Sequence, residues 1–278
     1  MKSCKNKKTI YKKKKITKNS KKNINKIKKA GANAETNPKP KFINYRNQAS
    51  LLSLRNNLTP DLVNLIIHAR KYIRTDLDIH DAVNKWCYNP VVAERIYGHI
   101  SKWDTSEVTN MSELFDNKEF FNDDISNWDV SEVTNMSCMF FGASSFNQDI
   151  GEWIVSKVSN MSSIFNDATS FNQDISGWDV SSVTDMSYMF YDAIIFNKDI
   201  SNWNVNKVNN MRKMFKGANS FNKDISKWDV SNVTNMSGMF ADAVSFNQDI
   251  SNWNVSSNTN MKYMFQDCPI DESYKPTQ

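Results

Sequence analysis

The stretch ISNWDVSEVTNMSCMFFGASSFNQD, residues 125–149, recurs at a spacing of 25 residues through almost all of the chain after residue 100. Tryptophan marks the repeat, and only Trp86 lies outside the series. The members are Trp103, Trp128, Trp153, Trp178, Trp203, Trp228 and Trp253. A short, strict period is typical of proteins in which each unit packs on the next. The stretch therefore predicts a stacked array of about seven units.

Each unit changes its hydrophobic period halfway along. Trp128 and Val130 alternate with polar residues as in a half-buried strand, so Asn127, Asp129 and Ser131 are expected to point outward. Apolar residues then follow at helical spacing, at Met136, Met139, Phe140 and Ala143. The predicted fold is an α/β repeat, a solenoid of about seven strand-plus-short-helix units.

The N-terminal region differs from the repeats in charge. Residues 1–41 contain 16 lysines and one acidic residue, a net charge of +15, whereas residues 42–278 have a net charge of −10. The first segment lacks apolar clusters, which predicts disorder. It is a candidate nuclear address or weak polyanion anchor, with an inert extension as the alternative. The basic residues singled out are Lys12, Lys13, Lys14, Lys15, Lys21, Lys22, Lys28 and Lys29.

Helical signals lie between this tail and the first repeat. One helix is predicted to start at Thr59, a second to run to Trp86, and a third to lie between Pro90 and Gly98. Since the end of a solenoid exposes its core, we interpret these helices as an α-helical cap. The predicted organisation is a disordered tail over 1–41, a helical N-terminal cap over 42–99, the solenoid over 100–268 and a C-terminal tail over 269–278.

The outward residues of the predicted strands form the candidate site. They are Asp104, Ser106, Asn127, Asp129, Ser131, Asp179, Ser181, Asn204, Asp229, Ser231 and Asn254, and Ile154 interrupts the row. Extended faces of repeat proteins commonly bind partners, so this acidic-polar face is a candidate docking surface for a protein or a glycan. The alternative is that these residues only face solvent and form turns.

The same row gives little reason to expect catalysis. Aspartates on adjacent strands could lie near 5 Å apart, but an open row has no cleft that raises one pKa and excludes water. We therefore expect no enzyme activity, no catalytic residues and no cofactor. The three histidines have no metal-ligand spacing, and calcium binding by the carboxylates is left open.

Targeting signals are also lacking in the sequence. The first 27 residues carry charges throughout, no apolar run is long enough to span a membrane, and Cys4 has no preceding lipobox segment. We expect an intracellular monomer, with the nucleus as one destination that the basic tail suggests. Surface display is the alternative.

The most regular unit, FNKDISKWDVSNVTNMSGMFADA over residues 221–243, closely resembles the repeat of BspA-like leucine-rich-repeat surface proteins, a type abundant in Mycoplasma lipoproteins. Residues 82–115 resemble the N-terminal module of members from protists and large DNA viruses. The resemblance implies a leucine-rich-repeat-like solenoid used for adhesion or protein binding, without catalytic residues. The leading hypothesis is a non-enzymatic scaffold that binds a protein through the acidic-polar face. A surface adhesin and a polyanion-binding tail are the alternatives.

Overall fold

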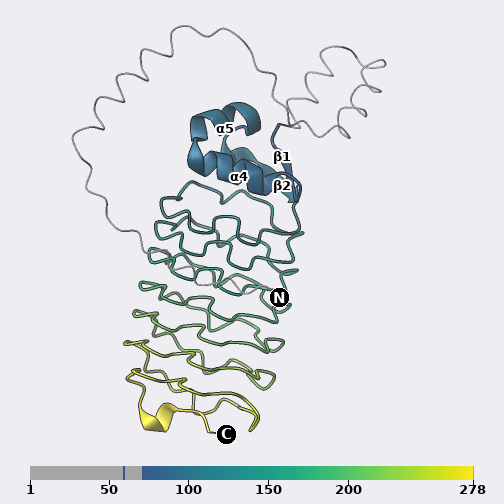
Figure 1. The fold of residues 1–278 in the computed structure, drawn as a ribbon. Coiled ribbons are helices and arrows are strands. Elements are labelled where there is room, and N and C mark those ends of the chain that lie inside the picture. Colours follow the sequence, from purple (N-terminus) through teal and green to yellow (C-terminus); the bar gives the residue numbers. More distant parts are fainter. Residues whose placement is uncertain (1–58, 60–70, 278) are drawn as a thin grey trace, which may run out of the picture. The chain divides into compact units, whose positions relative to one another are not determined.

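The computed structural model describes Thr59 and residues 71–277. The chain divides into two compact units, Met1–Leu65 and Ile66–Gln278, and only the second is described below. The lysines of the predicted tail and most of the helix predicted from Thr59 lie outside the described residues. In the second unit, two helices are followed by coils of chain stacked one on the next (Figure 1).

The regular elements gather at the start of this unit. They are β1 (Ile73–Thr75), α4 (Ile79–Tyr88), α5 (Pro90–Tyr97), the 3₁₀ turn η1 (Ile100–Lys102), β2 (Asp104–Glu107) and, near the C-terminus, η2 (Glu272–Tyr274). Of the three helices predicted before the repeats, the second and third are present as α4 and α5. The Asn89 side chain accepts the Val92 N–H at the start of α5, and Gly98 ends that helix at a φ of 77°. Ile73 begins β1, which pairs in parallel with β2.

Successive coils are joined by backbone hydrogen bonds at the repeat spacing. A column of single-residue parallel bridges links Asn110, Asn135, Asn160, Asp185, Asn210, Asn235 and Asn260. Around one bridge, the Thr134 N–H donates to the Thr109 carbonyl at 2.9 Å, and the Met136 N–H donates to the Asn160 carbonyl at 3.0 Å. Each coil therefore satisfies backbone groups of its neighbours, as a parallel ladder does.

The short helix predicted over residues 136–143 is wrong, because consecutive turns form there instead. The Met139 N–H donates to the Met136 carbonyl, while the Cys138 N–H donates to the Ser162 carbonyl of the next coil. Cys138 has a φ of 56°, which fits the third position of a type II turn and is foreign to an α-helix. Bonds between coils thus replace the i→i−4 bonds of a helix, although the apolar side chains still face inward.

The predicted strand is also wrong beyond the first unit. Only β2 is a strand at this position. In later units the segment runs straight into a turn, where the Val133 N–H donates to the Val130 carbonyl at 2.9 Å. The expected alternation of burial is nevertheless present, since Trp128 and Val130 are buried and Asp129 is exposed. The continuous bridge column lies five to seven residues later, directly before the segment in which the spacing predicted a helix.

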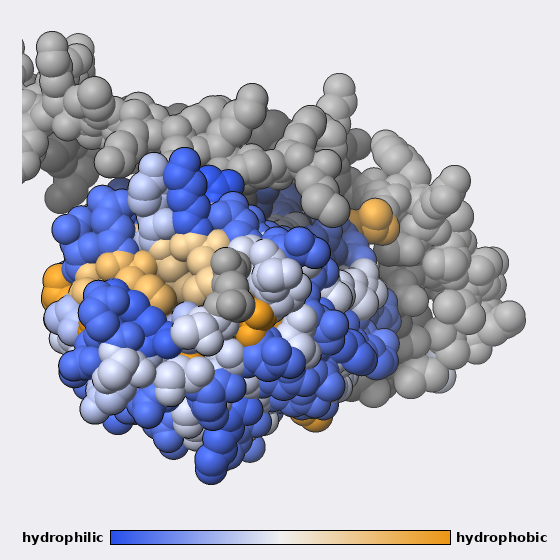
Figure 2. All heavy atoms as spheres, turned by 90° about the horizontal axis from the view of Figure 1, so that it is seen from below, coloured by the Kyte–Doolittle hydropathy of each residue, from blue (hydrophilic) through white to orange (hydrophobic). Residues whose placement is uncertain are grey.

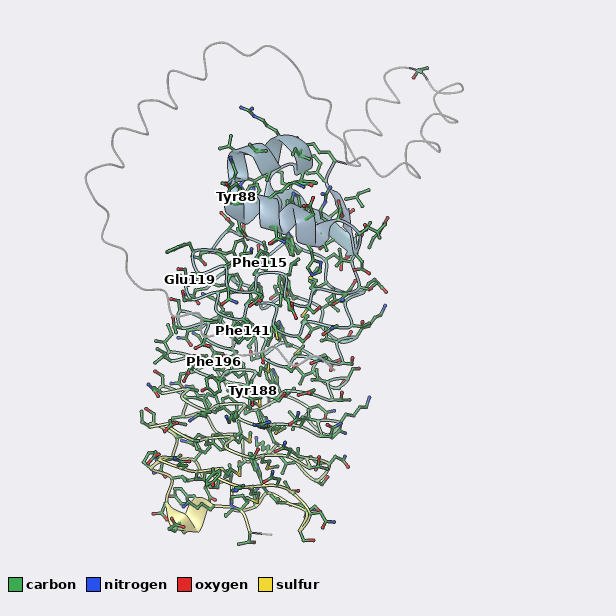
Figure 3. The ribbon with its side chains drawn as sticks, in the orientation of Figure 1. Tyr88, Phe115, Glu119, Phe141, Tyr188 and Phe196 are labelled. Carbon is green, nitrogen blue, oxygen red and sulfur yellow. The ribbon has the colours of Figure 1, made fainter. Side chains whose placement is uncertain are left out.

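Aromatic rings form the core of the stack. Phe115 and Phe140 stack with centroids 5.3 Å apart, and the next ring, Phe165, follows at 5.7 Å. Figure 3 shows Phe115 among the side chains inside the coils. The Trp178 indole N–H donates to the Ile150 carbonyl of the preceding coil at 3.0 Å, a bond that recurs from Trp128 to Trp253. The repeated tryptophan thus contributes both apolar area and a bond between coils.

The first coil is tied to α4 by side-chain bonds. The Trp86 indole N–H donates to Asp123 at 2.8 Å, and Lys118, which stands where the next five units have alanine, donates to Asn84 at 2.8 Å. These bonds hold the helix on a coil whose face would otherwise be exposed.

The last coil is covered by the segment predicted as a C-terminal tail. Ile270 is buried, and the Ile250 N–H donates to the Tyr274 carbonyl at 3.0 Å. Met261 and Phe265 remain only partly buried. Figure 2 shows this end, where an apolar area remains among hydrophilic residues. The two ends of the stack are therefore covered to different extents.

Candidate functional site

One position of the predicted face is exposed in every coil, and we call this series of residues the Asp129 column. It comprises Asp104, Asp129, Ile154, Asp179, Asn204, Asp229 and Asn254, one per coil, all of them exposed. Asn127 is also exposed, whereas Ser131 is half-buried. The exposed Ile154 interrupts the charge, as the sequence indicated.

Most members of the column accept hydrogen bonds from their own turn. Asp129 Oδ1 accepts the Ser131 N–H at 2.9 Å, and Asp229 Oδ1 accepts both the N–H and the hydroxyl of Ser231, at 3.1 and 2.7 Å. Asp104, Asp179 and Asn204 accept the corresponding N–H in the same way. These are Asx-turns, which hold a side chain in one orientation. The turn-forming interpretation therefore applies to these residues.

Turn formation leaves the carboxylates charged. Hydrogen bonds from the Ser131 hydroxyl and N–H lower the pKa of Asp129, and the corresponding serines do the same for Asp179 and Asp229. An ionised carboxylate has about four acceptor positions, and the turn uses one oxygen. The other oxygen of an exposed aspartate can thus accept a bond from a partner.

A second series of aspartates was not predicted as a site from the sequence. It has an aspartate at every member, and we call it the Asp124 column. Its members are Asp124, Asp149, Asp174, Asp199, Asp224 and Asp249, all exposed. Asp124 Oδ1 accepts the N–H and hydroxyl of Ser126, at 2.9 and 2.7 Å. The sequence did contain a signal for this column, because each of its aspartates lies two residues after the Phe-Asn pair of its repeat.

The two columns flank one turn. Asp124 and Asp129 stand on either side of the turn closed by the Trp128 N–H and the Ile125 carbonyl. Serine hydrogen bonds lower the pKa of Asp249, while the charge of Asp224 acts in the opposite direction. Asp224 and Asp249 are therefore close enough to interact electrostatically. A hollow of about 340 Å³ lies between Asp224 and Asp249.

A ladder of asparagines has a structural role. The Asn147 N–H donates to Asn122 Oδ1 at 2.8 Å, and the pattern continues to the C-terminal end, where the Asp271 N–H donates to Asn247 Oδ1. These asparagines therefore join successive coils, although their side chains are exposed or half-buried.

Within residues 71–277, no group of three or more His, Cys, Asp or Glu residues is placed to hold a metal ion. Burial raises the pKa of the Cys87 thiol to about 11, so this group is a neutral thiol at physiological pH. None of the described helices has the length and apolar character needed to cross a membrane.

Comparison of the sequence with known protein families gives one match. A family model described as a Mycoplasma protein of unknown function, DUF285, matches residues 88–201 and again residues 174–274. The first match covers α5 and the coils that follow it, and the second covers the later coils up to η2. No curated protein and no solved structure matches the chain.

Proposed function

The chain belongs to the Mycoplasma protein family of unknown function DUF285, and we propose that it is a non-enzymatic scaffold that binds a basic protein partner through its two aspartate columns. The observation that carries this proposal is the exposed carboxylate held by its own turn, which recurs in all six members of the Asp124 column and in four of the seven members of the Asp129 column. Asp124 and Asp129 represent the two positions.

Fixed carboxylates favour binding for a physical reason. A side chain already held by its own turn loses little conformational entropy when a partner binds. Repetition along the stack suits an extended segment with several lysines or arginines, and rows of like charge also steer a partner of opposite charge. The hollow between Asp224 and Asp249 adds a recess on the same surface.

The fold class belongs to the same proposal. Parallel bridges at the repeat spacing support a leucine-rich-repeat-like solenoid in which turns take the place of the helix in each unit. We also propose that the chain is of the variant found in protists and large DNA viruses, whose N-terminal module residues 82–115 resemble in sequence.

The test removes charge while keeping the turns. Asn204 occupies the Asp129 column and accepts its turn N–H at 3.3 Å, so Asp→Asn is compatible with the fold. A triple variant with Asp129→Asn, Asp179→Asn and Asp229→Asn is titrated with a fluorescent lysine-rich peptide by anisotropy. We expect the affinity to fall about tenfold or more, since each charge pair contributes on the order of a kcal/mol.

A matched control loses the same three charges elsewhere. Asp167→Asn, Asp185→Asn and Asp267→Asn have native precedents, since Asn117 and Asn135 stand at equivalent positions. This control is expected to keep most of the affinity. Equal losses in the two triple variants would reject the columns as the binding surface and leave only net charge.

A further inference from the structure

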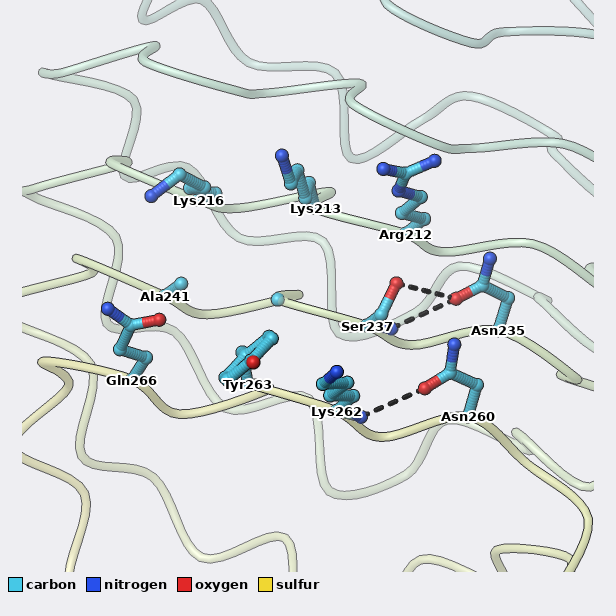
Figure 4. A pocket seen from close by; sticks show the side chains of 11 residues that line it. Arg212, Lys213, Lys216, Asn235, Ser237, Ala241, Asn260, Lys262, Tyr263 and Gln266 are labelled. Carbon is cyan, nitrogen blue, oxygen red and sulfur yellow. Dashed lines mark hydrogen bonds between the residues drawn. The ribbon is translucent and has the colours of Figure 1, made fainter.

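A hollow lined by basic residues, in contrast to the acidic columns, lies on the turn segments of three successive coils near the C-terminus. Its volume is about 470 Å³, within the range of small-molecule sites. Figure 4 shows Arg212, Lys213 and Lys216 along one coil, Ala241 on the next, and Lys262 on the third. These residues belong to the turns that follow the bridge column and not to the aspartate columns.

The hollow exists because one unit has small residues where the others have larger ones. Gly238 is buried, with a φ of 62°, and its equivalents in the other units all carry side chains. They are Glu113, Cys138, Ser163, Tyr188, Lys213 and Tyr263. Ala241, three residues later, is also buried and forms part of the lining. The stem of Lys213 lies over the floor, because a Cβ added at Gly238 would come within 3.3 Å of Lys213 Cγ.

Positive charge gathers around this floor without matching negative charge. Lys216 forms an ion pair with Asp242, but no ion pair within residues 71–277 involves Arg212, Lys213 or Lys262. None of the described lining residues is acidic. Burial, together with repulsion from Arg212 and Lys216, lowers the pKa of Lys213. An anion in the hollow would relieve this repulsion.

Aromatic and hydroxyl groups complete the lining. The Tyr263 side chain is 63% exposed, and Lys262 Nζ lies 4.9 Å from its ring centroid. The Ser237 hydroxyl donates to Asn235 Oδ1 at 2.8 Å and can still accept a bond. A tetrahedral anion alone would not fill the volume, so the ring of an ester could lie against Tyr263.

We propose that this hollow binds a phosphate or sulfate ester of a small molecule, with the oxyanion held by Arg212, Lys213 and Lys262. Guanidinium and ammonium groups are the usual partners of such oxyanions. The proposal does not rest on the aspartate columns, and its ligand has the opposite charge to theirs. Failure of one proposal would therefore leave the other intact.

The experiment is calorimetric titration of the full chain at low salt with phenyl phosphate, phenyl sulfate and phenol. We expect at least one ester to bind with saturation and phenol not to bind. A preference between the two esters identifies the source of the oxyanion. Lack of saturable binding by both esters would overturn the proposal.

Substitutions in the hollow test whether the ester binds there. Lys213→Gln and Arg212→Gln are each expected to weaken ester binding about fivefold to tenfold, since a charge-assisted bond is lost. Gly238→Tyr fills the hollow with a residue that two other units carry at the same φ, and Gly238→Ser is the milder version should tyrosine destabilise the coil. The control, Lys227→Ala, removes an exposed lysine outside the hollow. Equal affinity in the wild type, Lys213→Gln and Gly238→Ser would contradict the assignment.

Discussion

The aspartate columns and the basic hollow place charge on the same backbone in opposite ways. Asp229 has donors within its own turn, and its equivalents recur in most units. Lys213 has no ion-pair partner among the described residues, and it stands where other units have unrelated side chains. Residues repeated every 25 positions therefore stabilise the coils, whereas residues that depart from the repeat give this chain a surface that the other units do not share.

The substitution with the largest expected effect on stability removes a core residue that recurs in every unit. Trp178→Ala deletes a buried ring and the bond from its indole N–H to the Ile150 carbonyl. We expect the free energy of unfolding to fall by about 3–5 kcal/mol, measured by denaturant melting. Ile154→Ala, at an exposed position, is the control and should change it by about 0.5 kcal/mol or less. A loss below about 1 kcal/mol for Trp178→Ala would show that the repeat does not mark the core.

A second test separates the turn from the charge. Asp229→Ala removes the acceptor of the Ser231 N–H and hydroxyl, and should cost about 0.5–1.5 kcal/mol in thermal or denaturant unfolding. Asp229→Asn keeps an acceptor, as Asn204 does, and should cost less. Equal losses for the two variants would mean that charge, and not the turn bond, is what stabilises the coil.

Acidification tests both columns together. The pKa of Asp124, Asp129 and Asp174 is lower in the folded chain, chiefly because of serine hydrogen bonds. Their contribution to stability is complete above the pKa of the unfolded chain and is lost as the pH falls through the folded values, which means below about pH 4. The melting temperature should drop in this range. The decline should be shallower in the triple Asp129→Asn, Asp179→Asn, Asp229→Asn variant, and an identical decline would contradict the assignment.

The smallest expected effect on stability concerns the hollow. Lys213→Gln removes a cation that has no ion-pair partner within residues 71–277 and that Arg212 and Lys216 repel. The free energy of unfolding should therefore change by no more than about 0.5 kcal/mol. A loss comparable to that of Asp229→Ala would show that Lys213 supports the coil, and the contrast between the two regions would disappear.

Burial in the stack could be predicted from sequence because it follows side-chain type and spacing. Trp128, Val130, Met136 and Phe140 are all buried, as their period predicts. The local backbone could not be predicted in the same way. An i, i+3, i+4 spacing fits a helix and equally fits consecutive turns, and the choice depends on hydrogen bonds to the next coil that a single unit does not contain.

The candidate site was predictable only in part. The Asp129 column followed from strand alternation even though no strand forms there after the first unit. The Asp124 column was overlooked because its residues precede the apolar alternation, although their spacing is more regular. The hollow at Gly238 depends on contacts among three coils, and one glycine in a variable position gives no signal by itself.

The most direct measurement of the central claim is zero-length carbodiimide cross-linking between the full chain and a lysine-rich peptide, followed by mass spectrometry. Cross-links should concentrate on the Asp124 and Asp129 columns, whose carboxylates are exposed and ionised. Few should form at Asp185 and Asp267, which lie outside both columns. Cross-links spread evenly over all exposed acidic residues, or absent from both columns, would contradict the account.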